Sequence, residues 1–390
     1  MKINPPLLAL AIGAFGIGVT EFAPMGMLPV IANDLGVSIP MAGLLVSAYA
    51  FGVLVGAPIM TLAFAGMARR RLLMLSMTIF TVGNLISAFA DGYWTLLLGR
   101  IVTSFNHGAF FGVGAVVAAS VVPADKRAGA VAAMFSGLTI ATIGGVPLAA
   151  WVGEAIGWRT AFFGIAIIGA IALLAVRISL PPLKVDGETD IGSELKVLAR
   201  GPVLAALLLT VVSASAMFTV FTYIAPILQV ETGAASAYVT AMLVIYGLGL
   251  AVGNLMGGRF ADRSLDGTLI ASLLAVIVLL VLFAAFMGSK IIAVPLIFLW
   301  GIASFALMPP LQMRVVSEAA EAPNLASAMN IGAFNLGNAL GAALGGAVID
   351  AGLGYPAVSL AGAGTALVGL IFTLLLRRGR QRTEAAAACG

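Results

Sequence analysis

The sequence has little charge and very few residues that can bind metal or form disulfides. Only 9% of its 390 residues are charged, and it contains one histidine and one cysteine, Cys389. A single cysteine excludes an internal disulfide, and these two residues cannot supply a structural zinc or iron–sulfur site. About a quarter of the residues in a soluble domain are charged, so the composition argues against a soluble enzyme, a nucleic-acid-binding protein and a secreted disulfide scaffold.

Motifs of ATP-driven and hydrolytic chemistry are also missing. The sequence has no G-x-x-x-x-G-K-[ST] phosphate loop, no H-E-x-x-H and no G-x-S-x-G. Gly247, Gly249 and Gly253 resemble a dinucleotide loop only in spacing and lie in a hydrophobic run, which favours helix packing. We therefore expect no enzyme activity, no cofactor and no metal, and an ion gradient as the energy source.

What the sequence has in abundance is apolar length. It is 61% hydrophobic, its mean hydropathy is +1.13, and apolar runs recur between charged or Gly/Pro-containing turns. A bilayer-spanning helix needs about 20 such residues, and only helices or closed barrels span lipid. The runs predict an all-α polytopic membrane protein with twelve spans at 7–30, 41–64, 72–90, 94–121, 128–153, 160–180, 203–229, 238–260, 268–288, 291–316, 325–350 and 356–376.

The basic residues lie mostly on one side of these spans. Seventeen of the 20 Lys and Arg residues fall on the side of the two termini, Arg159 and Lys290 fall opposite, and Arg100 lies within a span. The positive-inside rule then places both termini in the cytoplasm. This asymmetry explains the basic pI without a nucleic-acid partner. The absence of an Asn-x-Ser/Thr acceptor fits a bacterial inner membrane.

A polar stretch at 181–200 divides the chain into two halves of six spans. Ile191, Leu195 and Leu198 have helical spacing there, which predicts a short amphipathic segment on the cytoplasmic surface. The expected organisation is a six-helix bundle at 1–180, a linker at 181–200, a second bundle at 201–376 and a basic cytoplasmic tail at 377–390.

The two halves share short patterns at nearly equal offsets. Tyr49-x-x-Gly52-x-x-x-Gly56 recurs 197 residues later from Tyr246, and the Ala-Met-x-x-Gly pattern from Ala133 recurs 195 residues later from Ala328. Small residues at this spacing also occur wherever two membrane helices pack closely. Duplicated halves are typical of secondary transporters.

Twelve spans, a 6+6 duplication and a polar central loop resemble the major facilitator superfamily. Gly258-Arg-Phe-Ala-Asp262-Arg263 is similar to that family's loop between spans eight and nine, and Arg100 to its span-four arginine. The matching loop in the first half has Arg69, Arg70 and Arg71 but no aspartate.

Two further segments narrow the resemblance. Gly144-Gly145-Val-Pro147 is similar to the span-five motif of antiporters, with valine where the family has glycine before the proline, and the segment 18–29 resembles the first span of the arabinose-efflux-permease-like branch. That branch belongs to the 12-span drug:proton antiporters and includes exporters of sugars, purine nucleosides and chloramphenicol. The resemblance implies a secondary transporter with a small-molecule substrate.

Glu21 is the candidate proton carrier because it is the one acidic residue deep within a predicted span. A carboxylate at that depth costs about 2.5–3.5 kcal/mol on insertion scales, so function is the first interpretation and a structural pair the second. Arg100 lies at a comparable depth in span four, and spans one and four are neighbours in the resembled fold. Protonation of Glu21 would leave Arg100 unpaired and bias the conformation; a static ion pair is the alternative.

Other intramembrane groups are candidates for a substrate cavity or for gating. His107 shares a helix face with Arg100 and Phe111, and intramembrane amides either line a cavity or hold helices together. The cavity candidates are His107, Asn106, Tyr49, Phe111, Tyr223, Gln312, Asn335 and Asn338. The gating or structural candidates are Arg69, Arg70, Arg71, Gly144, Gly145, Pro147, Asp262, Arg263, Pro309 and Pro310, of which the prolines should kink their helices.

These features predict a proton-coupled exporter of a small organic solute, such as a sugar, nucleoside or drug, that works by alternating access as a monomer in the lipid bilayer. Uptake by proton symport or facilitated exchange is an alternative in the same class. A membrane-embedded sensor or enzyme and a passive channel are alternatives from other classes. A sensor or enzyme would need a catalytic constellation or a signalling domain, and the sequence shows neither. The duplication disfavours a passive channel.

Overall fold

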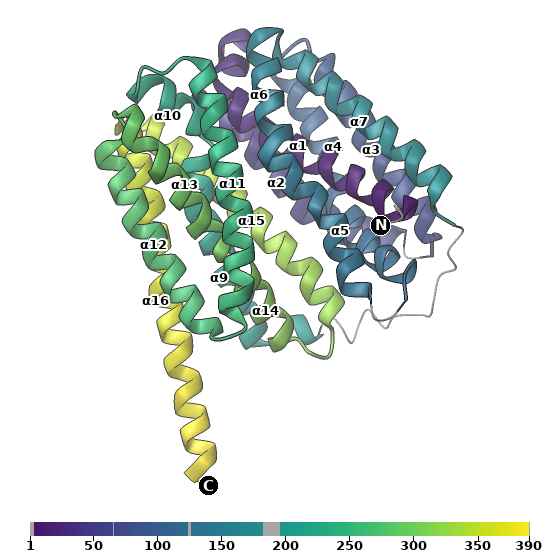
Figure 1. The fold of residues 1–390 in the computed structure, drawn as a ribbon, viewed down its shortest axis with the longest axis vertical. Coiled ribbons are helices and arrows are strands. Elements are labelled where there is room, and N and C mark those ends of the chain that lie inside the picture. Colours follow the sequence, from purple (N-terminus) through teal and green to yellow (C-terminus); the bar gives the residue numbers. More distant parts are fainter. Residues whose placement is uncertain (1–3, 65, 124–125, 182–195, 390) are drawn as a thin grey trace. The chain divides into compact units, whose positions relative to one another are not determined.

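The fold was analysed in a computed structural model that describes residues 4–64, 66–123, 126–181 and 196–389. The described chain is helical, and no strand occurs in these ranges (Figure 1). Twelve helices or composite helices are long and apolar enough to cross a membrane. This confirms the fold class expected from the apolar runs, although the first span extends beyond its predicted end at residue 30.

The helices of the N-terminal half are α1 (Pro5–Leu35), α2 (Ile39–Ala63), α3 (Arg69–Ala88), α4 (Tyr93–Ser120), α5 (Arg127–Ile140), the π-helical turn η2 (Ala141–Gly145), α6 (Val146–Ala155) and α7 (Trp158–Ser179). Those of the C-terminal half are α9 (Gly201–Phe221), α10 (Ile224–Glu231), α11 (Ser236–Ala261), α12 (Leu265–Phe286), α13 (Lys290–Ala306), α14 (Met308–Glu318), α15 (Pro323–Asp350) and α16 (Gly354–Cys389).

Three spans are composite because a proline interrupts each of them. Proline lacks an N–H, and its ring clashes with the carbonyl four residues earlier. The π-helical turn precedes Pro147, a break at residues 222–223 precedes Pro226, and α14 begins beside Pro309 and Pro310 after a break at Leu307. In the π turn the Val146 N–H donates to the Ala141 carbonyl, which shows the wider ring directly.

Contacts between helices divide the chain into two compact units. One contains Met1–Asp190 with Thr222–Gly247, and the other contains Ile191–Phe221 with Leu248–Gly390. Thus α10 and the first half of α11 group with the N-terminal helices, whereas the predicted bundles at 1–180 and 201–376 place them with the C-terminal helices. The predicted bundle boundaries stay a prediction.

In the first unit α1 is the central helix. It contacts α2, α4, α5, α6, α7 and α10, and most of its length from Ala9 to Ala32 is buried. In the second unit α9 packs against α14, α15 and α16. Each unit therefore encloses one helix whose polar side chains must find partners within the protein, not in lipid or water.

The repeated glycine patterns lie at equivalent helix contacts in the two units. A Cβ on Gly56 would lie 3.0 Å from the Phe105 Cα of α4, and one on Gly253, its counterpart 197 residues later, would clash with the Ile302 carbonyl oxygen of α13. Only glycine permits so close an approach. Since α4 and α13 belong to the fourth and tenth spans, the contacts agree with a duplicated six-span plan.

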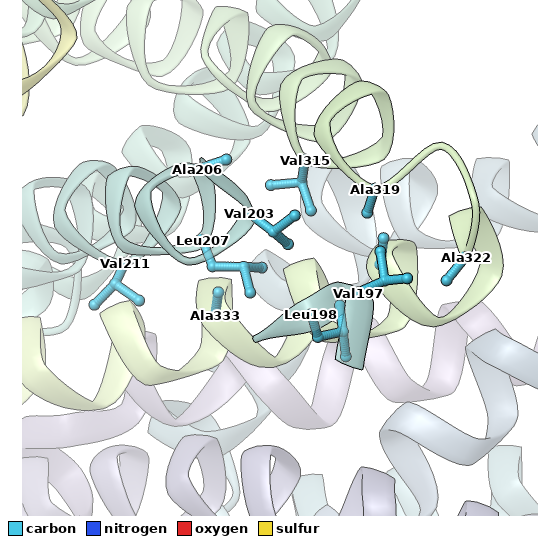
Figure 2. Packing of buried hydrophobic residues seen from close by; sticks show 11 residues of the cluster. Val197, Leu198, Val203, Ala206, Leu207, Val211, Val315, Ala319, Ala322 and Ala333 are labelled. Carbon is cyan, nitrogen blue, oxygen red and sulfur yellow. The ribbon is translucent and has the colours of Figure 1, made fainter. Parts of the chain in front are cut away.

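The last residues of the central linker pack against the second unit. Figure 2 shows Val197 and Leu198 packed into a buried cluster with side chains of α9, α14 and the start of α15. The cluster comprises Val197, Leu198, Val203, Ala206, Leu207, Val211, Val315, Ala319, Ala322, Ala326 and Ala333. Leu198 therefore packs against protein, while Ile191 and Leu195 fall outside the described residues, so the amphipathic segment on the cytoplasmic surface stays a prediction.

A bidentate ion pair lies beside this cluster. Arg200 donates from Nη1 to Glu321 Oε1 at 3.0 Å and from Nη2 to Oε2 at 2.7 Å. The guanidinium holds the pKa of the Glu321 carboxyl below its usual range through the hydrogen bond and the charge. Both side chains are exposed, so the pair contributes little to stability but fixes the connection into α9.

Arg159, one of the two basic residues predicted on the outer side, ties together the ends of several helices. Its Nη1 donates to Asp34 at the end of α1, its Nε donates to the Ala90 carbonyl at 2.8 Å, and its guanidinium lies 4.1 Å over the Trp158 ring. Trp158 also donates to Asp34 at 3.0 Å. Arg159, although it lies on the outer side, therefore has an acidic partner in Asp34 and a structural role in joining helix ends.

Candidate functional site

Glu21 lies in the middle of α1 and is almost completely buried, with 3% of its surface exposed. It is the one buried acidic side chain in the described ranges. Its Oε1 has no hydrogen-bond partner there. A buried carboxylate oxygen without a partner costs free energy, which marks this position as a functional candidate.

Arg100 on α4 is buried beside Glu21 but contacts the preceding residue of α1. Its Nη1 donates to the Thr20 carbonyl at 2.8 Å and to Thr20 Oγ1 at 3.2 Å. Its Nε and Nη2 have no partner, and the described part of the chain contains no ion pair between Arg100 and Glu21. The sequence brings the two groups to neighbouring positions, but Arg100 is held by Thr20.

Thr20 is held in turn by α3. Its Oγ1 donates to Asn84 Oδ1 at 2.7 Å, and the Asn84 amide donates to the Phe80 carbonyl at 2.8 Å. All of these groups are buried. A fully enclosed chain of hydrogen bonds therefore links α3, α1 and α4 next to Glu21. Thr20 was not among the predicted site residues, because a threonine in an apolar run has no distinguishing signal.

Tyr49 on α2 covers the other side of Arg100. The guanidinium carbon lies 4.1 Å from the Tyr49 ring centroid, within the range of a cation–π contact. The Tyr49 hydroxyl lies 3.1 Å from His107 Nδ1. The His107 ring centroid lies 5.1 Å from that of Phe111, which stacks on Phe135. The structure thus brings Glu21, Arg100, Tyr49, His107 and Phe111 into one continuous cluster.

The remaining predicted cavity residues of the first unit lie elsewhere or face their own helix. Asn106 donates from Nδ2 to the Thr103 carbonyl one turn earlier, and its Oδ1 has no partner. Tyr223 lies in the break before α10, where its hydroxyl is close to Gly43 near the start of α2. Neither has a described contact with Glu21 or Arg100.

In the second unit, Gln312 belongs to a satisfied polar network. Its Nε2 donates to Ser327 Oγ at 2.7 Å, and its Oε1 accepts from Asn330 Nδ2 at 2.6 Å. Asn330 Oδ1 accepts from Thr210 at 2.7 Å. This network joins α9, α14 and α15, which favours the helix-holding interpretation for Gln312.

Asn335 and Asn338 on α15 differ from Gln312 because part of their hydrogen-bonding capacity is unused. Asn335 donates to the Ile331 carbonyl at 3.0 Å, but its Oδ1 has no partner, and neither amide atom of Asn338 has one. Both residues are buried, with exposed fractions of 1% and 0%. They remain candidates for contact with a polar solute.

The motif residues lie at helix ends. Arg70, in the first turn of α3, donates to the Arg177 carbonyl in the last turn of α7, where a cation is favourable. Arg69 and Arg71 belong to the same turn, and Asp262 and Arg263 are exposed in the turn after α11. Gly144, Gly145 and Pro147 form the π turn and the start of α6.

A buried ion pair, missed from the sequence, lies near the last of these loops. Arg314 on α14 is 1% exposed and forms a salt bridge with Asp266 in the first turn of α12. The charge asymmetry predicted for Arg314 only a position on the side of the two termini, and Asp266 was not singled out. Their pairing depends on how α12 and α14 meet, which the spacing of the sequence does not contain.

Comparison with known proteins agrees with this architecture. The family model described as Major Facilitator Superfamily matches residues 10–332. The chain belongs to this family. It is 56% identical to the inner membrane transport protein YdhP of Escherichia coli strain K12 over 98% of both chains.

More distant relatives and a solved structure extend the family comparison. The chain is 32% identical to the putative transporter AraJ of Escherichia coli strain K12, over 98% of this chain and 96% of that one. It is also 32% identical to the chloramphenicol resistance protein of Streptomyces lividans, over 86% and 87%. A crystal structure of a bacterial homolog of the human lysosomal transporter Spinster superposes with a TM-score of 0.70 at 17% identity and 96% coverage of both chains, which shows the shared fold.

Membership of this family makes the chain a multi-pass membrane transporter and not an enzyme. The relatives are consistent with the drug:proton antiporter branch that the motifs resembled. The family assigns a small-molecule substrate in general terms.

Proposed function

We propose that this chain exports a small organic solute in exchange for protons by alternating access, as a monomer in a bacterial inner membrane with both termini in the cytoplasm. The location and the solute class are supported by relatives named as an inner membrane transport protein and a chloramphenicol resistance protein. The orientation is supported by the charge asymmetry of the loops. Sugars, nucleosides and drugs are the classes to test.

One observation carries the proton coupling. Glu21 is a buried carboxyl group with an unpartnered oxygen, and the nearby buried arginine has an unpartnered Nε–Nη2 edge while its Nη1 is held by Thr20. A protonated Glu21 and a Thr20-bound Arg100 form one state of such a site. When Glu21 loses its proton, the carboxylate attracts the free edge of the guanidinium, which matches a carboxylate in geometry.

This change provides two states that differ by one proton. In one, Arg100 is anchored to the backbone of α1; in the other, it also binds the side chain that follows. Because helices α1 and α4 carry the two groups, a shift of Arg100 changes how these helices pack. A ligand or proton that favours one arrangement shifts the population of the transporter.

The unpartnered amides of Asn335 and Asn338 support a neutral polar solute as the cargo. An amide offers both a donor and an acceptor, which suits hydroxyl, carbonyl or amide groups. The second unit contributes these groups without a buried acidic side chain among its described residues. We therefore propose that solute contacts in this unit are neutral hydrogen bonds.

The test is proton movement in everted membrane vesicles that contain the protein. L-arabinose, adenosine and chloramphenicol represent the three solute classes, and the matched variants are Glu21→Gln and Glu154→Gln, since Glu154 is exposed at the end of α6. We expect one class to release protons from energised vesicles, the Glu154 variant to do the same, and the Glu21 variant to be inactive although folded. Normal proton release by the folded Glu21→Gln protein would remove Glu21 from the coupling mechanism.

Uptake by proton symport is the second candidate, because the same buried carboxyl group serves either direction. Vesicles of defined orientation with an imposed pH gradient separate the two. Accumulation of solute with protons moving the same way identifies symport, whereas opposed movement identifies exchange.

A further inference from the structure

Tyr49 has a different polar neighbour on each part of its side chain. The face of its ring lies under the Arg100 guanidinium at 4.1 Å, and its hydroxyl lies 3.1 Å from His107 Nδ1. Arg100 and His107 are seven residues apart on α4, about 10 Å along the helix. Tyr49 on α2 is therefore the side chain that connects them.

The position of Tyr49 is fixed by close packing of α2 on α4. Gly52 meets Ser104, Gly56 meets the backbone of Phe105, and a Cβ on Gly108 would lie 2.2 Å from the Ala57 Cβ. These contacts continue along α2 from the turn after Tyr49. Because neither helix can slide without a clash, the distance from the hydroxyl to His107 is set by the backbone.

The hydrogen bond between Tyr49 and His107 has two possible directions. In a neutral imidazole one nitrogen carries a proton and the other accepts. If Nδ1 donated to Tyr49, the phenolic O–H would be buried without an acceptor, because the described residues offer it no second partner. A buried, unsatisfied donor costs about 1–3 kcal/mol, so this direction is unfavourable.

If Tyr49 donates to Nδ1, the proton of the imidazole lies on Nε2. This nitrogen has no hydrogen-bond partner in the described part of the chain, yet it is not among the fully enclosed unpartnered atoms, and His107 keeps 4% of its surface exposed. The N–H then lies on the ring nitrogen that no described residue binds or fully encloses, which leaves it available to a solute or water. The positive charge over the phenol ring favours the same direction, because it stabilises electron density on the ring and oxygen and makes the hydroxyl a better donor.

We infer that Tyr49 is a positioning residue that holds His107 in the Nε2–H tautomer, so that His107 presents a hydrogen-bond donor to an acceptor oxygen of the transported solute. The tautomer is independent of the transport direction and of proton coupling. The solute contact rests on the proposed function. It assigns the solute at least one carbonyl, ether or hydroxyl oxygen at the His107 position.

His107 is the single histidine of the chain, which permits a direct measurement. Protein labelled with 15N-histidine in detergent or nanodiscs has one pair of ring-nitrogen resonances, and their shifts and couplings report which nitrogen carries the proton. In the wild type we expect a protonated Nε2 and a hydrogen-bonded, unprotonated Nδ1. A protonated Nδ1 in the neutral wild-type ring would overturn the inference.

Two tyrosine variants separate the hydroxyl contact from general effects. Tyr49→Phe keeps the ring under Arg100 and removes the hydroxyl, so the Nδ1 resonance should shift towards that of an acceptor without a hydrogen bond. Tyr93→Phe is the control, because it removes a hydroxyl that donates to the Met41 carbonyl away from this cluster. An unchanged Nδ1 resonance in folded Tyr49→Phe, or an equal change in Tyr93→Phe, contradicts the positioning role.

The solute contact is tested with His107→Gln and His107→Met in the vesicle assay, with L-arabinose, adenosine and chloramphenicol as probes. Glutamine can place an N–H near the Nε2 position, whereas methionine cannot. We expect the half-saturating concentration of the active probe to rise roughly three- to tenfold in His107→Met and much less in His107→Gln. Equal values for wild type and His107→Met refute the solute contact.

The outcomes also separate this inference from the proposed function. Wild-type vesicles that move no protons with any probe, together with an Nε2–H tautomer that depends on Tyr49, would remove the proposed coupling and the solute contact and leave the positioning role intact. Active, Glu21-dependent transport with the opposite tautomer would remove the positioning role alone.

Discussion

The buried ion pair between Arg314 and Asp266 predicts an asymmetric response to removal of either partner. Arg314 is 1% exposed and Asp266 is 25% exposed, so their environments differ although they share one contact. At a charge separation of about 4 Å and an effective dielectric constant near 20, the attraction is about 4 kcal/mol. Because the Asp266 carboxylate is partly exposed to solvent, the net stabilisation from the pair is smaller than this attraction.

Asp266→Asn leaves a buried guanidinium without its carboxylate, and we expect the free energy of unfolding to fall by about 3 kcal/mol. Arg314→Met fills most of the same volume and leaves a carboxylate that is partly solvated and lies in the first turn of α12, where the helix dipole favours negative charge. That loss should be nearer 1 kcal/mol. The difference between the two variants is the decisive quantity.

The assay is reversible unfolding of the purified protein in mixed micelles, followed by tryptophan fluorescence, for both single variants and the double variant. The double variant should lose about 1–3 kcal/mol less than the sum of the two single losses. Equal losses from the two single variants, or additive losses in the double variant, would show that the pair does not act as a buried, coupled unit.

Three further predictions concern packing, the polar cluster and pH. Gly253→Ala should lower the free energy of unfolding by about 1–3 kcal/mol because the new Cβ meets a backbone carbonyl of α13, whereas the Cβ of Gly258→Ala on the same helix meets nothing and that variant should be neutral or stabilising. Unfolding in mixed micelles compares the two variants, and equal losses refute the close-packing explanation. Thr20→Val removes a hydroxyl that accepts from Arg100 and donates to Asn84 on α3, so it should lower the free energy of unfolding by about 1–3 kcal/mol and Thr20→Ser by much less. Similar stabilities of the two variants in the same assay would contradict this role. The pKa of Glu321 is lowered in the folded protein, so the stability that its pair with Arg200 contributes is present above the unfolded-state pKa and is lost as the pH falls through the folded-state pKa. Arg200→Gln should therefore weaken the fall in thermal stability on acidification, and an identical pH profile in the variant would refute the assignment.

The sequence was sufficient for the class of the protein and the number of its spans. Hydrophobicity over about 20 residues is a local property, and lipid leaves the helix as the one way to satisfy the backbone of each run. Pro147, Pro309 and Pro310 also marked places where the regular helix is disturbed, since the missing N–H and the ring clash act within one turn. Proline alone does not decide this, because Pro24, Pro29, Pro58 and Pro295 lie inside continuous helices. The buried acid and arginine were visible because charge is rare in such runs.

The partners of those buried groups were decided by tertiary structure. Glu21 and Arg100 have matching depths, but the rotation of α1 about its axis presents Thr20 to the guanidinium, and Asn84 on α3 completes that contact. Depth follows from counting residues, whereas rotation follows from the packing of several helices together.

The same reason explains the other contacts that the sequence did not contain. Asp266 and Arg314 are 48 residues apart in the chain, and Leu198 is packed against protein because α9, α14 and α15 offer it a buried cluster. The sequence by itself determined which segments enter the membrane and which rare polar groups they carry. Only the packed helices determined which of these groups meet, because a side-chain contact depends on the relative rotation and close approach of helices distant in the chain.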